Sequence, residues 1–130
     1  MANPNIVNVT AIYGTTTYFV PSGTTAIVLL ANAASSGLVY KINQIVVANT
    51  TGSAANATVA VYSNGAVAQG SAPAGGTAYP VVSAVSVPAN ASLIAVDKTT
   101  AIYLMEGTSI SITSGTASAL TFTISYENIS

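Results

Sequence analysis

The stretch from Val85 to Ser114 constrains the fold most strongly, because short apolar runs alternate there with residues that end strands. Leu93–Val96 and Ala101–Leu104 are compact apolar runs, and the isoleucines that follow them alternate with serine and threonine. Turn-forming segments separate these runs: Pro88–Asn90, Asp97–Thr100 and Glu106–Gly107. Period-two alternation bounded by such residues indicates strands joined by tight turns. The close spacing of the turns is typical of a sandwich or barrel of antiparallel strands.

The remainder of the chain continues this pattern and contains no convincing helix. The further strands that we expect are Asn5–Tyr13, Tyr18–Val20, Ala26–Ala31, Leu38–Ala48, Ala57–Tyr62, a strand that opens at Tyr79, and Leu120–Tyr126. Gly14–Thr17 is expected to be a turn, and a phase slip at Gln44 indicates either a bulge or a bend from one sheet to the other. We therefore predict an all-β chain, a single antiparallel β-sandwich over residues 1–130 that is jelly-roll-like and has eight or nine short strands.

Both ends of the chain offer candidate contacts with other molecules. The segment Asn5–Tyr13 begins so early that residues 1–13 could equally form an arm exchanged with a neighbouring subunit. Its candidate contact residues are Ile6, Val7, Val9, Ile12 and Tyr13. The last predicted strand carries Thr121 and Thr123 on an uncharged face, so little protects that strand from pairing with another chain.

A third candidate lies beside the longest loop. Ser63–Thr77 is rich in alanine, glycine, proline and serine, and a loop of this length in a compact domain is usually functional or mobile. Most of the seven tyrosines are expected to pack on the sheets, because aromatic residues are enriched in strands. Tyr79, next to the loop, is the candidate for an interface or a sugar-stacking surface.

The chain carries very little charge. Charged residues make up 4% of the sequence, against about 25% in an average soluble domain. Hydroxyl and amide groups must therefore supply the polar surface, and they lose water at lower cost than ions do. A net charge of −1 also removes the repulsion that keeps proteins apart. We expect a subunit of a larger assembly; the alternative is a secreted β-domain that merely tolerates low charge.

The same composition argues against several classes of function. The sequence has no histidine and no cysteine, which removes the usual general base, the thiolate nucleophile and zinc ligands. No acidic cluster suits calcium, and no glycine motif suits a nucleotide, so we expect no enzyme, no metal and no cofactor. Two lysines without arginine argue against nucleic acid, and no apolar run reaches the ~20 residues of a membrane helix. The first residues do not resemble a secretory signal.

Several segments resemble small virion structural proteins of tailed bacteriophages, especially those of cyanobacterial and other aquatic hosts. The segments that carry the resemblance are VPANASLIAVDKTTAIYLMEGTSISIT, the closing TISYENIS, the opening NIVNVTAIYG and NAASSGLVYKINQIVVAN. Together they cover most of the chain except residues 53–80. One departure is Thr108 after the Glu106–Gly107 turn, where the family pattern leads us to expect aspartate, and this argues against an ion-binding turn.

The resemblance implies a structural role in a virion. The first expectation is a capsid decoration (cement) protein, on the outer surface of the head, that stabilises the shell by binding across capsid subunits. Its partners would be the major capsid protein or another virion protein and further copies of itself, with a trimer favoured, and it would be made in the host cytoplasm. The first alternative is a tail, baseplate or fibre component, a host-binding module that would use Tyr79 and the Ser63–Thr77 loop. The second, from a different class, is a secreted polysaccharide-binding module of cellular origin. Strand addition through Asn5–Tyr13 is the expected mode of contact.

Overall fold

The computed structural model describes residues 9–130, which form nine β-strands and one short 3-10 helix. The elements are β1 (Ile12–Phe19), β2 (Ile27–Asn32), β3 (Val39–Asn49), β4 (Ala55–Tyr62), β5 (Ala78–Val87), β6 (Ser92–Val96), η1 (Lys98–Thr100), β7 (Ile102–Leu104), β8 (Thr108–Ser114) and β9 (Leu120–Ile129). The prediction of an all-β fold with about nine strands is confirmed.

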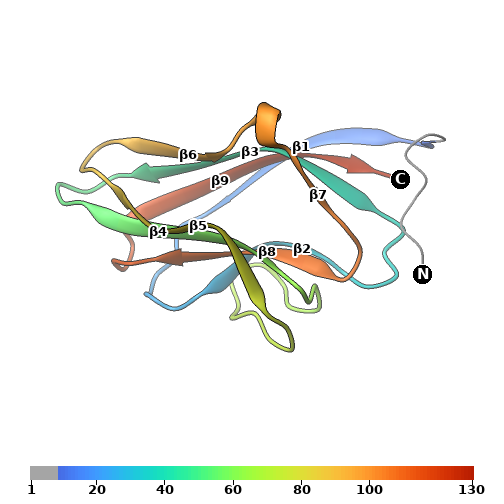
Figure 1. Ribbon diagram of the computed structural model, residues 1–130, viewed down its shortest axis with the longest axis horizontal. Coiled ribbons are helices and arrows are strands. Elements are labelled where there is room, and N and C mark those ends of the chain that lie inside the picture. Colours follow the sequence, from blue (N-terminus) through green and yellow to red (C-terminus); the bar gives the residue numbers. More distant parts are fainter. Residues whose placement is uncertain (1–8) are drawn as a thin grey trace.

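The strands form two antiparallel sheets that lie one above the other (Figure 1). Sheet A has the order β1-β9-β3-β6, with β7 also paired to β3, and sheet B has the order β2-β8-β4-β5. The pairing is nested along the chain: β1 pairs with β9, β2 with β8, β3 with β6 and β7, and β4 with β5. This nested order across two packed sheets is that of a jelly roll.

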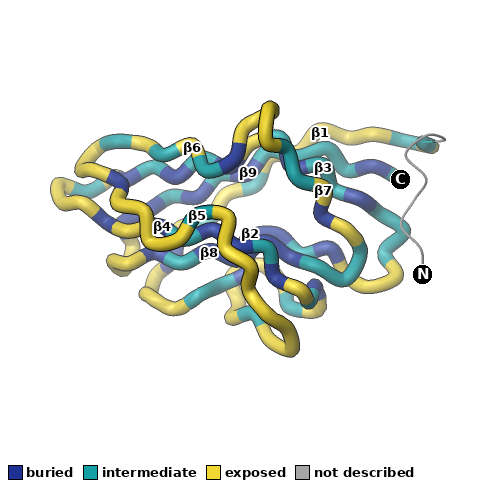
Figure 2. The backbone as a smooth tube through the Cα atoms, in the orientation of Figure 1, coloured by how far each residue is buried: buried dark blue, intermediate teal, exposed yellow. Residues whose placement is uncertain are grey.

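A hydrophobic cluster packs between the sheets. Its buried residues come from strands of both sheets, and Figure 2 marks the buried positions along the backbone. Leu120, Phe122 and Ile124 of β9 point into it and are fully buried, so the predicted alternation of the last strand is confirmed. Phe122 lies in register with Phe19 of β1 and Val47 of β3. Burial of this apolar surface is the main force that holds the two sheets together.

The predicted start of the chain is wrong in the described part. We expected a strand to end at Tyr13 and a turn at Gly14–Thr17, whereas β1 runs without interruption from Ile12 to Phe19. Each residue of β1 pairs in unbroken register with β9, for example Gly14 with Glu127. The ladder supplies the backbone hydrogen bonds, and threonine suits a strand, so tertiary pairing overrides the local turn signal. Residues 5–8 of the predicted strand lie outside the described residues.

The phase slip in the third predicted strand is a bulge. The register between β3 and β9 shifts between Ile42 and Gln44, as the sequence indicated. The alternative, a bend from one sheet to the other, is wrong, because β3 belongs to sheet A along its whole length. The bulge lets Ile42 and Ile45 both reach the core, where each is fully buried.

The loop Ser63–Thr77 is fastened to sheet B at several points. The Tyr62 hydroxyl donates to the backbone oxygen of Gly76 at 2.9 Å, and the Ser109 hydroxyl donates to that of Asn64 at 2.9 Å. Ser109 and Ser111 are buried, although the alternation of β8 placed them on the side away from the core. Buried hydroxyls need partners, and for Ser109 the loop provides one.

Two buried asparagines link the sheets at the ends of their strands. Asn32, the last residue of β2, donates from Nδ2 to the backbone oxygen of Leu104 in β7 at 3.0 Å. Asn49, the last residue of β3, donates from Nδ2 to the backbone oxygen of Val87 in β5 at 3.0 Å. Each bond therefore joins sheet A to sheet B. Neither asparagine is distinguished by the sequence pattern alone.

Candidate functional site

The side of sheet A that points away from sheet B carries a row of apolar and hydroxyl side chains. Directly opposite residues in an antiparallel ladder lie on the same face, and the row follows from the register. From β1 to β6 its members are Tyr18, Thr123, Val46 and Ile94. The two end residues are strongly exposed, Tyr18 at 70% and Ile94 at 59%.

Two neighbouring rows have the same character. They are Thr16, Ser125 and Gln44 on one side, and Thr121, Ala48 and Ser92 on the other. The hydroxyls of Thr16 and Ser125 are hydrogen-bonded to each other at 3.0 Å, which confirms that both side chains lie on this side of the sheet. We call these three rows together the uncharged face.

Charged side chains lie outside these three rows: Lys41 and Glu127 lie beyond one end, and Asp97 and Lys98 directly follow β6 at the edge of the sheet. Lys41 of β3 lies opposite Glu127 of β9, and Tyr103 of β7 lies on the other side of Lys41. The Glu127 carboxylate accepts a hydrogen bond from Nδ2 of Asn43 at 2.9 Å. The three rows themselves can therefore be covered by another molecule without the removal of water from an ion, which is the costliest part of burying a polar surface.

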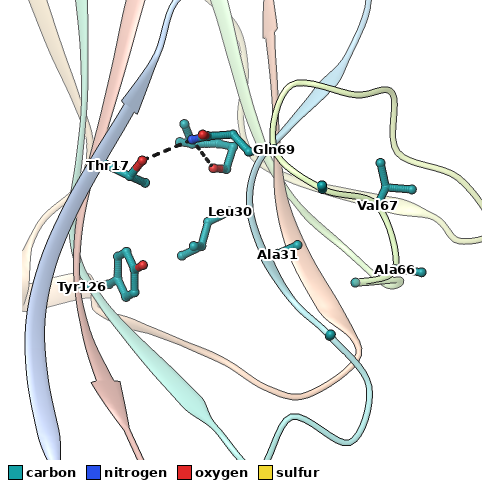
Figure 3. A pocket seen from close by; sticks show the side chains of 11 residues that line it. Thr17, Leu30, Ala31, Ala66, Val67, Gln69 and Tyr126 are labelled. Carbon is teal, nitrogen blue, oxygen red and sulfur yellow. Dashed lines mark hydrogen bonds between the residues drawn. The ribbon is translucent and has the colours of Figure 1, made fainter.

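An open pocket of about 420 Å³ lies where β1 and β2 diverge, between sheet A and the loop that follows β4 (Figure 3). Thr17 and Tyr126 line it from sheet A, and Leu30 and Ala31 line it from β2. Its polar groups are few. Burial raises the pKa of Tyr126 above its ordinary value, with a further contribution from Tyr40.

Gln69 fixes the loop wall of this pocket. Its Nε2 donates to the backbone oxygen of Leu29 at 2.9 Å and to the hydroxyl of Thr17 at 3.3 Å (Figure 3). The amide thus connects β2 of sheet B to β1 of sheet A across one side of the pocket. The remaining lining is apolar and suits an apolar or aromatic side chain better than a charged ligand.

The structure brings some of the predicted contact residues together and separates others. Thr121 and Thr123 lie on the uncharged face, and Ile12 and Tyr13 lie on the adjoining strand β1, exposed at 54% and 65%. Val9 precedes β1 and is half-buried. Tyr79 is exposed on β5 of the other sheet, so it does not belong to the same surface. Ile6 and Val7 lie outside the described residues.

Sequence reasoning missed Tyr18, Val46 and Ile94 as members of the uncharged face. Each belongs to a strand that was predicted at least in part, but the row exists only through the register between four strands. The bulge in β3 moves Val46 by one position relative to a regular strand, and β6 carries a second register shift next to Ile94. Neither shift could be placed from the sequence alone.

The carboxylates lie in separate places and serve local structure. Glu106 accepts a hydrogen bond from the backbone N–H of Gly37 at 2.7 Å, and Asp97 caps η1 by accepting from the backbone N–H of Thr99 at 2.9 Å. The Thr99 hydroxyl and backbone N–H hold the pKa of Asp97 below its ordinary value. Within residues 9–130 no three acidic side chains gather into a group that could hold a metal ion.

Replacing Thr99 by valine is expected to raise the pKa of Asp97 towards its ordinary value, because the largest stabilising hydrogen bond to the carboxylate is lost. Because the pKa of Asp97 is lower in the folded than in the unfolded state, its ionised carboxylate stabilises the fold at pH values above the unfolded-state pKa. This stabilisation is lost as the pH falls through the folded-state pKa. NMR titration of the Asp97 carboxyl carbon measures the change. Thr113→Val, on sheet B, is the control and should leave the titration unchanged.

Within residues 9–130, no helical segment is long and apolar enough to cross a bilayer. Comparisons with protein-family models, with curated proteins and with solved structures found no match for this chain.

Proposed function

We propose that this chain is a structural subunit of a bacteriophage virion, and most specifically a capsid decoration protein that binds across joints between capsid subunits. The observation that carries the proposal is the uncharged face, which crosses sheet A from Tyr18 to Ile94 without an ionic group. The segments that resemble phage virion proteins supply the kind of assembly. The jelly roll occurs in viral capsid domains, although it also serves many other functions.

The proposed contact works by exclusion of water. Tyr18, Val46 and Ile94 supply apolar area, and the hydroxyls of Thr121 and Thr123 supply hydrogen bonds that cost little to transfer from water to a protein partner. Such a contact does not depend on attraction between opposite charges. Salt screens charges and strengthens apolar burial slightly or leaves it unchanged, so the bound state resists high ionic strength.

Intact particles washed in molar salt are therefore expected to retain this chain, as measured by mass spectrometry of the particles and of the supernatant. Thr123→Lys places an ammonium in the middle of the uncharged face and is expected to abolish binding to particles that lack the protein. Thr113→Lys is the matched control on the outer side of sheet B and should bind normally. Release of the wild-type chain by salt, or equal binding by both variants, would refute this mode of attachment.

Copy number separates the proposed location from its main alternative. Hundreds of copies per particle support decoration of the head, whereas a few to a few dozen support a tail, baseplate or fibre component. One observation favours the alternative: Tyr79 is 61% exposed on β5, next to the 63–77 loop, where an aromatic ring could stack on a sugar. Binding of the purified chain to host glycans that is lost in Tyr79→Ala would favour a fibre or glycan-binding role.

A further inference from the structure

A sandwich of two open sheets has four edges, and three of them in this chain are protected against pairing with another strand. The edge of β2 is covered by the loop after β4: the backbone N–H of Val28 donates to the oxygen of Ser71, and the N–H of Gly70 donates to the oxygen of Val28, both at 2.9 Å. These two bonds occupy the backbone N–H and oxygen of Val28, so the loop takes the place of a foreign strand at this point of the edge.

The edges at β5 and at β6 and β7 are protected in other ways. β5 contains Pro80, a left-handed residue at Ala84 (φ 48°) and two register shifts against β4, so its backbone does not offer a regular ladder. On the far edge of sheet A, β6 and β7 have 5 and 3 residues and are separated by η1. Very short edge strands are a common protection against unwanted pairing.

The edge of β1 has no such protection within the described chain. β1 has 8 residues, contains neither proline nor a charged residue, and pairs with β9 without a register shift. Within residues 9–130, β9 is its only strand partner. A long, regular, uncharged edge is a template for the addition of another strand.

We propose that a second copy of this chain occupies this edge, with the two β1 strands antiparallel about a twofold axis perpendicular to sheet A. Such an axis places the core-facing sides of the two copies of sheet A on the same side of the extended sheet. An inward-pointing residue of one β1 must therefore lie opposite an inward-pointing residue of the other. Thr17 and Phe19 point inward, because they lie opposite Ile124 and Phe122 of β9. The inward set in β1 is therefore the odd-numbered residues.

The register with Thr15 opposite Thr15 of the second copy places the exposed side chains of β1 against one another. Ile12 then lies opposite Tyr18 of the second copy on the outer side, and Tyr13 lies opposite Thr17 on the inner side. These three apolar side chains are 54%, 70% and 65% exposed in the single chain. The interface is self-complementary, as a twofold contact requires.

The pocket beside β1 fits this arrangement. Thr17 lines the pocket, so the Tyr13 ring of the second copy lies at its mouth, next to Leu30 and Tyr126. Strand addition commonly combines backbone hydrogen bonds with a pocket for one side chain, and here the edge and the pocket adjoin. The absence of charge on β1 and a net charge of −1 mean that two copies repel each other very little.

The dimer also joins the two uncharged faces into one continuous surface, because the axis leaves both on the same side of the extended sheet.

The proposal stands on the geometry of β1 and does not require the virion role. A dimer that does not bind particles would overturn the proposed function alone, whereas a monomer that binds particles would overturn the dimer alone. The proposed dimer is an alternative to the trimer that the resemblance implies, and the mass of the full chain in solution decides between them.

Sedimentation equilibrium of the full chain is expected to give a mass of twice 12.9 kDa, and a monomer or a trimer would overturn the proposal. The chain has no cysteine, so single substitutions report the register. Thr15→Cys is expected to form an intermolecular disulfide under mild oxidation, because directly opposite Cα atoms are about 4.5–5.5 Å apart.

Thr17→Cys is the matched control on the same side of β1. Its two copies lie roughly 13 Å apart along the strand in the proposed register, so it should not crosslink. Circular dichroism of both variants verifies that they are folded. Crosslinking of Thr17→Cys in preference to Thr15→Cys, or failure of a folded Thr15→Cys variant to crosslink, would overturn the proposed pairing.

Discussion

Replacement of Phe122 by alanine is expected to lower the free energy of unfolding by about 3–5 kcal/mol. Phe122 is fully buried between the two sheets and lies in register with Phe19 of β1 and Val47 of β3, so its removal leaves a cavity beside both of these strands. A domain of this size has a total stability of roughly 5–15 kcal/mol, and the variant is therefore close to unfolding. Urea denaturation followed by circular dichroism measures the loss as a lower transition midpoint.

Thr123→Ala is the control for this prediction, because Thr123 is the next residue of β9 and points to the opposite side. Its substitution should change the free energy of unfolding by less than about 1 kcal/mol. The pair tests which side of sheet A is inside. A Thr123→Ala variant that loses more stability than Phe122→Ala would place the threonine side in the core, and the uncharged face would then not exist.

The fold was predictable because its main signals are local. The alternation of Leu120, Phe122 and Ile124 identifies a half-buried strand without knowledge of its partners. The turns were also visible, since Asn90 and Gly107 adopt the left-handed backbone conformation that these residue types favour. The phase slip at Gln44 was correctly read as an irregularity, although only the structure decides between a bulge and a change of sheet.

One physical cause explains both the wrong prediction at the start of β1 and the failure to predict Tyr18, Val46 and Ile94 as members of the uncharged face. Glycine is disfavoured in strands, but Gly14 lies opposite Glu127 in a regular ladder. The local sequence does not predict that pairing. The row from Tyr18 to Ile94 depends in the same way on pairing between residues far apart in the chain. Local patterns predict which residues alternate, whereas the partner of each strand is decided by the packing of the whole domain.

The protection of the sheet edges was equally invisible in the sequence. Ser63–Thr77 reads as a flexible connection, yet Gly70 and Ser71 pair with Val28 and close the edge of β2. The composition of that loop predicts no such contact. Within residues 9–130 one edge is closed by a loop and two others are interrupted, so β1 is the edge at which we propose strand addition.

Replacement of Asn49 by alanine is expected to lower the free energy of unfolding by roughly 2–4 kcal/mol, a large effect for a polar residue. The Asn49 side chain is almost fully buried, and it donates to the backbone oxygens of Ser53 at 2.8 Å and Val87 at 3.0 Å. Its own oxygen accepts from the backbone N–H of Thr51 at 2.9 Å. Alanine removes all three bonds and leaves the buried backbone oxygen of Val87 without this partner at the junction between the sheets. Urea denaturation measures the cost.

Two further variants identify the cause of that loss. Asn49→Asp keeps the shape and the accepting oxygen but removes the donor to Val87 and Ser53, so at neutral pH it should lose at least as much stability as alanine. Asn56→Ala, at an exposed position in β4, should change the free energy of unfolding by about 0.5 kcal/mol or less. If Asn49→Ala were as mild as Asn56→Ala, the amide would not be a link between the sheets. The sandwich would then be held by its apolar core alone, and Asn32 at the other end of the core would be expected to be equally dispensable.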